Sequence, residues 1–222
     1  MSMSCLRISA HGRGKGSMIL EKGNTILEFA VVSMIIVPLF FGMVGSGIIL
    51  GRSIEVLQIC RDLGHMYAKG IDFSQAGNQN IAVTLATGTG MTATGGNAVV
   101  ILSQVIQVYQ ADCDAGNHPA DCGNLNKNVF ISRIVIGNAS LRVSNYGTPA
   151  AGIVNASGNI AATDYLTNSS AVANNIGGEL TAAGLTLSQG DVVWMTEIHA
   201  TSPDISFLGS SGSTGIYAKA IY

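Results

Sequence analysis

The feature that most constrains the fold is a long uncharged apolar run near the N-terminus. From Phe29 to Gly51 the chain has 23 residues without a charged side chain. As a helix this run would be roughly 34 Å long at about 1.5 Å per residue, and the hydrocarbon core of a bilayer is about 30 Å thick. Core helices of soluble proteins rarely run this far without a charge, so we predict a transmembrane helix over residues 24–51. Pro38 is expected to kink it.

The distribution of charge predicts the orientation of this helix. Residues 1–23 contain four basic side chains and one acidic, a net charge of +3, whereas residues 24–222 contain seven basic and twelve acidic, a net charge of −5. Basic flanks stay on the cytoplasmic side of a membrane, so residues 52–222 are expected to be exported. The net charge of the whole chain is −2. Such a chain has no excess of cations for phosphates, and nucleic acid is not an expected partner.

Four glycines in the apolar run have the spacing of a helix-packing surface. Gly47 and Gly51 are four residues apart, and Gly42 and Gly45 come one turn earlier. Small residues at this spacing let two membrane helices approach closely. Glycine is also frequent in transmembrane helices in general, so both interpretations stay open.

The start of the run carries a family resemblance. The residues Lys22-Gly23-Asn24-Thr25-Ile26-Leu27-Glu28-Phe29 resemble the class III signal of type IV pilins and pseudopilins, in which a basic leader ends in Gly and Glu plus an aromatic residue follow. The resemblance implies that a prepilin peptidase cuts between Gly23 and Asn24 and removes residues 1–23, including Cys5. It also implies that Glu28 pairs with the new amino group of Asn24 on a neighbouring pilin or pseudopilin subunit. Two opposite charges near lipid offset each other's desolvation only when they are close.

Within that group, the N-terminal third is similar to TadE/TadG-like proteins of the tight-adherence pilus system. Phe29, Pro38 and Arg52 match that pattern, and residues 192–198 with Pro203 loosely resemble its late strand with an internal Glu and a following Pro. The resemblance implies a non-catalytic minor pilin that contributes to assembly of a bacterial adhesion pilus. It implies a single pass through inner-membrane lipid, with the N-terminus cytoplasmic and the C-terminal domain periplasmic or extracellular.

The exported residues predict an α+β fold, in which a long N-terminal helix, half transmembrane and half exported, packs on a small antiparallel β-sheet. The helical pattern continues from Arg52 and stops near Lys69 and Gly70, so both halves form one helix of roughly 45 residues. Its apolar stripe is expected to comprise Ile54, Leu57, Cys60 or Arg61, Gly64 and Tyr67.

Segments rich in β-branched residues predict the strands of the sheet. These are 99–109, 129–136, 190–200 and 214–222, with a weaker candidate at 139–145. The first two are expected to form a hairpin with a long loop. A short helix is expected over 79–87, a loop over 88–97, and at most one short helix, near 168–177, in the Gly- and Asn-rich segment before the third strand.

The cysteines predict a disulfide outside the cytoplasm. Cys113 and Cys122 bracket a polar loop in the exported part, where oxidising conditions favour a disulfide between them. A metal site is the alternative, with Asp112, Asp114, His118 and Asp121 as further ligands, but the spacing fits no zinc or calcium pattern. Cys60 is expected to be a buried helix residue.

Candidate catalytic residues are few. Glu197 and His199 share one face of a predicted strand, which would suit acid–base chemistry, but a polar face of a half-solvated sheet explains them better. No hydrolase or metalloprotease motif is present, so we expect no enzyme activity, cofactor or metal. The alternative function is a secreted soluble binding protein with an ordinary signal peptide, with residues 29–44 as its apolar region and a cut near Gly47.

Overall fold

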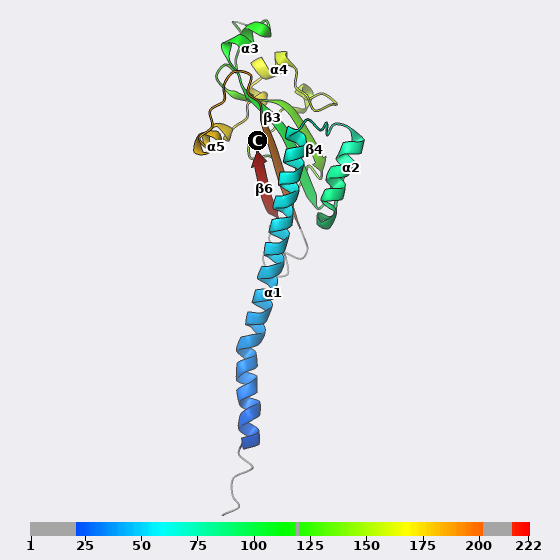
Figure 1. Ribbon diagram of the computed structural model, residues 1–222, viewed down its shortest axis with the longest axis vertical. Coiled ribbons are helices and arrows are strands. Elements are labelled where there is room, and N and C mark those ends of the chain that lie inside the picture. Colours follow the sequence, from blue (N-terminus) through cyan, green and yellow to red (C-terminus); the bar gives the residue numbers. More distant parts are fainter. Residues whose placement is uncertain (1–20, 119, 202–214) are drawn as a thin grey trace, which may run out of the picture. The chain divides into compact units, whose positions relative to one another are not determined.

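The fold is α+β, with a long N-terminal helix and a small antiparallel sheet (Figure 1). A computed structural model describes residues 21–118, 120–201 and 215–222. The chain divides into two compact units between Val44 and Gly45. Cys5, most of the expected leader and Pro203 lie outside the described residues.

Helix α1 (Glu21–Ala68) comprises 48 residues and contains Pro38. The segment from Thr25 to Ala68 is long and apolar enough to cross a membrane, and a signal sequence near an N-terminus meets the same criteria. In the part of α1 that belongs to the first unit, large apolar side chains such as Phe29 and Met34 are more than 70% exposed. We predicted one helix from Asn24 to a stop at Gly70, and the structure confirms a single helix over this segment. Gly70 has a left-handed φ of 87°, which suits a residue just after a helix.

The sheet contains four strands in the order β4-β3-β5-β6, and every neighbouring pair is antiparallel. The four strongly predicted strands are confirmed as β3 (Ala98–Gln107), β4 (Asn128–Gly137), β5 (Val193–Ala200) and β6 (Ile216–Ile221). Strands β3 and β4 form the expected long-looped hairpin, with a bulge between Gln104 and Val105. The weaker candidate at 139–145 is wrong, because this segment is a loop that runs over the sheet.

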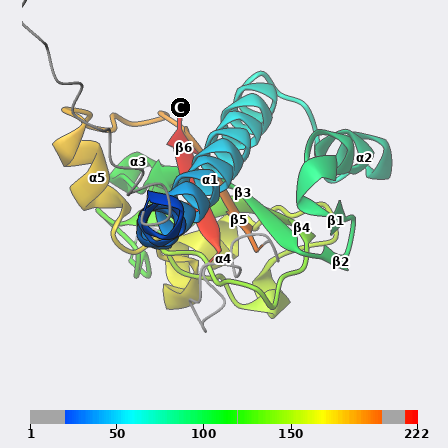
Figure 2. The same cartoon turned by 90° about the horizontal axis from the view of Figure 1, so that it is seen from below.

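The second half of α1 packs on one face of the sheet (Figure 2). Its buried side chains include Val56, Ile59, Cys60, Leu63 and Tyr67. The predicted stripe is therefore correct at Cys60, Gly64 and Tyr67. It is wrong at Ile54 and Leu57, which are 56% and 44% exposed. A stripe that follows 3.6 residues per turn backwards from Tyr67 passes through Val56 instead.

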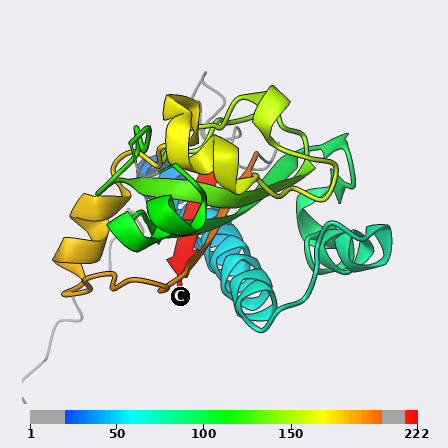
Figure 3. The same ribbon diagram turned by 90° about the horizontal axis from the view of Figure 1, so that it is seen from above.

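Short helices cover the other face of the sheet. The sheet thus lies between α1 and α4 (Figure 3). In the segment for which at most one short helix was expected, the structure has several, which corrects that prediction. They are η2 (Ala151–Ile153), α4 (Ala162–Thr167), η3 (Ser169–Ala171) and α5 (Ile176–Ala182). Apolar residues of these helices, such as Leu166 and Ile176, are fully buried. Tertiary burial stabilises them where local propensity is weak.

The remaining elements lie at the edges of the domain. Helix α2 (Ala76–Leu85) confirms the predicted helix and begins three residues earlier, and η1 (Thr87–Thr89) follows it. The expected loop over 88–97 contains a small hairpin of β1 (Met91–Thr92) and β2 (Gly95–Gly96), which corrects that prediction. Helix α3 (Gln110–Ala115) lies in the loop between β3 and β4.

Candidate functional site

The residues of the predicted processing site lie in the first turns of α1. The helix begins at Glu21, so the bond between Gly23 and Asn24 falls in its first turn. Glu28 and Phe29 follow on the next turn, and both are exposed. The helix therefore presents the acid and the aromatic residue on its surface, where a second molecule can reach them.

The glycines of the apolar run differ in their surroundings. Gly42, Gly47 and Gly51 are exposed, and a Cβ atom added to Gly47 or Gly51 would meet open space. Gly45 is buried. Because Gly47 and Gly51 are separated by one turn of the same helix, they leave a flat strip along α1 without side chains.

The half of α1 that packs on the sheet begins with a local ion pair. The guanidinium group of Arg52 lies 2.8 Å from the carboxylate of Glu55, and it also donates a hydrogen bond to the carbonyl of Gly88 at 3.2 Å. The second contact joins α1 to the segment after α2. Arg52 thus connects α1 to a segment that is 36 residues later in the chain.

The predicted disulfide between Cys113 and Cys122 is confirmed. Cys113 comes from α3 and is fully buried in a small cluster with Val108, Val129 and Leu166. The alternative of a metal loop is wrong, because the disulfide consumes both thiols. The described ranges 21–118, 120–201 and 215–222 contain no group of three His, Cys, Asp or Glu side chains placed to hold a metal ion.

Breaking this disulfide is expected to destabilise the domain. The two cysteines are nine residues apart, so the chain-entropy model gives a loss of about 2.7 kcal/mol in the free energy of unfolding. Urea titration of the full chain in detergent, followed by Trp194 fluorescence, measures this loss in the Cys113→Ala, Cys122→Ala double variant. Reductant is expected to lower the wild-type midpoint and leave that of the double variant unchanged. Equal midpoints for the wild type with and without reductant would contradict the stabilising role.

Cys60 is a free, fully buried helix residue, as predicted. Its thiol donates a long hydrogen bond of 3.5 Å to the carbonyl of Thr196 on β5. Burial, assisted by the charge of Glu197, raises the pKa of the Cys60 thiol to about 12. The thiol is therefore protonated and poorly reactive at neutral pH.

Glu197 departs most from its prediction. We expected it on a half-solvated polar face, but its residue is only 2% exposed, and His199 beside it is 8% exposed. The loop after β4 covers both. The Glu197 carboxylate accepts hydrogen bonds from the Ser144 hydroxyl, from the Asn145 N–H at 3.1 Å and from the Tyr217 hydroxyl at 2.7 Å. These donors satisfy a buried charge that would otherwise be costly.

Two arginines lie in the neighbourhood of this buried carboxylate. Arg133 on β4 is buried and donates a hydrogen bond to the carbonyl of Gly147. The Cζ atom of Arg142 lies over the Tyr217 ring, 4.3 Å from its centroid. Burial lowers the pKa of Arg133, and the charge of Glu197 opposes that shift. Burial and the positive charge of Arg142 both lower the pKa of His199. Burial, followed by the hydrogen bond to Glu197, raises the pKa of Tyr217.

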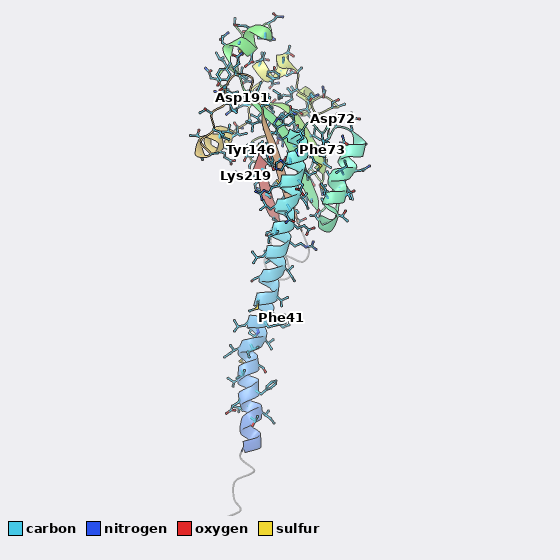
Figure 4. The ribbon with its side chains drawn as sticks, viewed as in Figure 1. Phe41, Asp72, Phe73, Tyr146, Asp191 and Lys219 are labelled. Atoms are coloured by element: carbon cyan, nitrogen blue, oxygen red, sulfur yellow. A yellow bond between two sulfur atoms is a disulfide. The ribbon has the colours of Figure 1, made fainter. Side chains whose placement is uncertain are left out.

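A second, more exposed acidic residue lies nearby on the same face. Glu179 of α5 forms an ion pair with Lys219 of β6 and accepts a hydrogen bond from Tyr146 at 2.5 Å. Figure 4 shows Tyr146 and Lys219 next to each other, in keeping with a distance of 5.7 Å from the Lys219 Nζ to the Tyr146 ring. Burial, with the hydrogen bond to Glu179, raises the pKa of Tyr146.

The sequence alone did not identify Ser144, Asn145 and Tyr217 as partners of Glu197. For Tyr217 the sequence does contain a signal of the face it occupies. It lies two residues before Lys219 on the edge strand β6, and residues two apart in a strand share a face. Ser144 and Asn145 are 53 and 52 residues from Glu197 in a loop, and no local pattern links them to it. The cluster fixes this loop to the sheet.

Comparisons with protein-family models, curated proteins and solved structures found no match for this chain.

Proposed function

We propose that the protein is a minor pilin or pseudopilin of the TadE/TadG type, a non-catalytic component that contributes to assembly of a bacterial adhesion pilus. The observation that carries the proposal is the pattern of Gly23, four residues and Glu28 directly ahead of 23 uncharged residues that begin with Phe29. A carboxylate beside such a run costs about 2.5–3.5 kcal/mol at mid-membrane and less near the interface. An acid in this position needs a partner, and an amine released by cleavage at Gly23 supplies one.

The helix supports this proposal. Helix α1 continues without interruption from Glu21 to Ala68 and therefore includes both the apolar run and the residues that pack on the sheet. A subunit that moves from lipid into a bundle of helices while its domain stays outside the membrane needs one segment that belongs to both. The exposed apolar side chains of residues 25–44 suit either lipid or neighbouring helices.

The domain after the helix suits an exported protein. It contains a disulfide, which forms and persists in the periplasm and outside the cell rather than in the cytosol. Residues 24–222 carry a net charge of −5 and follow a basic leader, a distribution that favours export of the C-terminal part. We therefore place the N-terminus in the cytoplasm and the domain in the periplasm or beyond, in a chain that passes the inner membrane once.

The mature N-terminus tests the proposal directly. Mass spectrometry of the protein recovered from cell envelopes is expected to identify Asn24 as the first residue. A Gly23→Val variant is expected to keep its leader, because it changes the residue that ends the leader in the signal this sequence resembles, whereas Gly16→Val is the matched control and should be processed normally. Ile48 as the first residue would instead support the secreted binding protein, and an intact leader on the wild type would refute both.

A further inference from the structure

The α1 face of the sheet changes from apolar to polar where the helix ends. Along β3 the side chains on this face are Ala98, Val100 and Leu102, all fully buried, and the next residue on that face is Gln104. Packing explains the apolar residues, because α1 covers them. Gln104 lies at the edge of this cover and is half-buried, so packing does not require a polar residue here.

Three neighbouring strands each place a polar or aromatic side chain in this row. Gln104 on β3 pairs directly with Ser132 on β4 and with Trp194 on β5, so the three residues stand side by side on one face. Tyr67, in the last turn of α1, reaches over them. Its hydroxyl lies 3.4 Å from that of Ser132, and its ring meets the Trp194 ring edge-on with centroids 4.9 Å apart.

The row forms the floor of a pocket of about 310 Å³. Asp72, just after the turn at Gly70, and Asn159, from the loop after η2, line the pocket together with the row. Figure 4 shows Asp72 beyond the end of α1. We call this site the Trp194 pocket and define it by Tyr67, Asp72, Gln104, Ser132, Asn159 and Trp194.

The chemistry of the lining excludes two classes of ligand. Among the described residues that line the pocket, Asp72 is the only one with a charged side chain. Hydrogen bonds from Ser74 and Gln75 lower the pKa of Asp72, so the pocket repels phosphates and carboxylates at neutral pH. An apolar ligand would cover hydroxyl and amide groups without replacing their hydrogen bonds to water, which costs free energy.

We propose that the Trp194 pocket binds a neutral mono- or disaccharide. Sugar hydroxyls both donate and accept hydrogen bonds, which suits the hydroxyls of Tyr67 and Ser132, the amides of Gln104 and Asn159 and the carboxylate of Asp72. The C–H face of a sugar ring packs on an aromatic side chain such as Trp194. The volume is at the lower end of the range for ligand pockets, about 300–1,000 Å³, and limits the ligand to a small saccharide. This inference does not rest on the proposed function, because all six residues belong to the folded domain.

The chain provides its own reporter for this test, because Trp194 is its only tryptophan. The full chain is kept in a zwitterionic detergent, since the usual glycoside detergents carry sugar headgroups that would compete. Glucose, galactose, mannose, N-acetylglucosamine, lactose and chitobiose are titrated, with inorganic phosphate and tetramethylammonium as charged probes. At least one sugar is expected to change Trp194 fluorescence with saturation, and phosphate is not.

Variants assign the signal to the pocket. Asn159→Ala is expected to weaken sugar binding about tenfold, which corresponds to about 1.4 kcal/mol. Gln189→Ala, which removes an exposed amide before β5, is the matched control and should bind as the wild type does. Three results would overturn the proposal: no sugar gives a saturable signal, both variants bind like the wild type, or tetramethylammonium saturates the signal and Asp72→Asn abolishes it. Equal urea midpoints for the variants and the wild type establish that folding is unchanged.

Discussion

Replacing Glu28 with alanine is expected to leave cleavage after Gly23 intact and to reduce the yield of assembled pili about tenfold or more. Under the proposed function, the pairing between the Glu28 carboxylate and the amine of Asn24 in the next subunit would form only in the assembled state. Removing the carboxylate leaves that amine unpaired in an apolar bundle, and about 1.4 kcal/mol per contact is enough for a tenfold change. Immunoblots of envelopes measure cleavage, and sheared fibres measure assembly.

Two further variants separate charge from bulk in this experiment. Glu28→Gln keeps the size of the side chain and removes its charge, so it should fail in assembly as the alanine variant does. Asp62→Ala removes an exposed acid from the domain half of α1 and is the matched control. Normal pili in cells with Glu28→Ala would show that the pairing role is wrong, even if the mature N-terminus is Asn24.

Glu197→Ala is expected to lower the free energy of unfolding of the domain by about 3 kcal/mol, because removing one member of a buried charged network costs about 3–5 kcal/mol. The change leaves the Ser144 and Tyr217 hydroxyls and the Asn145 N–H without their acceptor in a site that is 2% exposed. It also removes the negative charge that offsets the effect of burial on the Arg133 guanidinium group. Urea titration of the full chain with Trp194 fluorescence measures the loss.

Glu179→Ala is the matched control for this variant. Glu179 also accepts hydrogen bonds from a tyrosine and a lysine, but its side chain is 32% exposed. Water screens such a pair, and its loss is expected to cost about 1 kcal/mol or less. Glu197→Gln keeps the shape of the buried side chain and should lie between the two alanine variants. If Glu197→Ala and Glu179→Ala cost the same, the buried network is not a major source of stability.

The sequence by itself determined the elements whose signals are local. The uncharged run, the helical pattern up to Gly70 and the β-branched segments predict α1 and the four strands, because backbone preferences and periodicity act over a few residues. The Cys113–Cys122 disulfide was predictable for the same reason, since its partners are nine residues apart and separated by a single polar loop.

Tertiary structure alone decided which polar residues are buried and which meet. Glu197 is predicted on a solvated face because its strand alternates, and it is buried because a loop more than 50 residues earlier covers it. The row of Ser132, Gln104 and Trp194 exists because strand register aligns three distant segments at the last turn of α1. Contacts of this kind depend on the global packing of the chain, in which residues far apart in sequence share one small volume, and local sequence patterns carry no record of them.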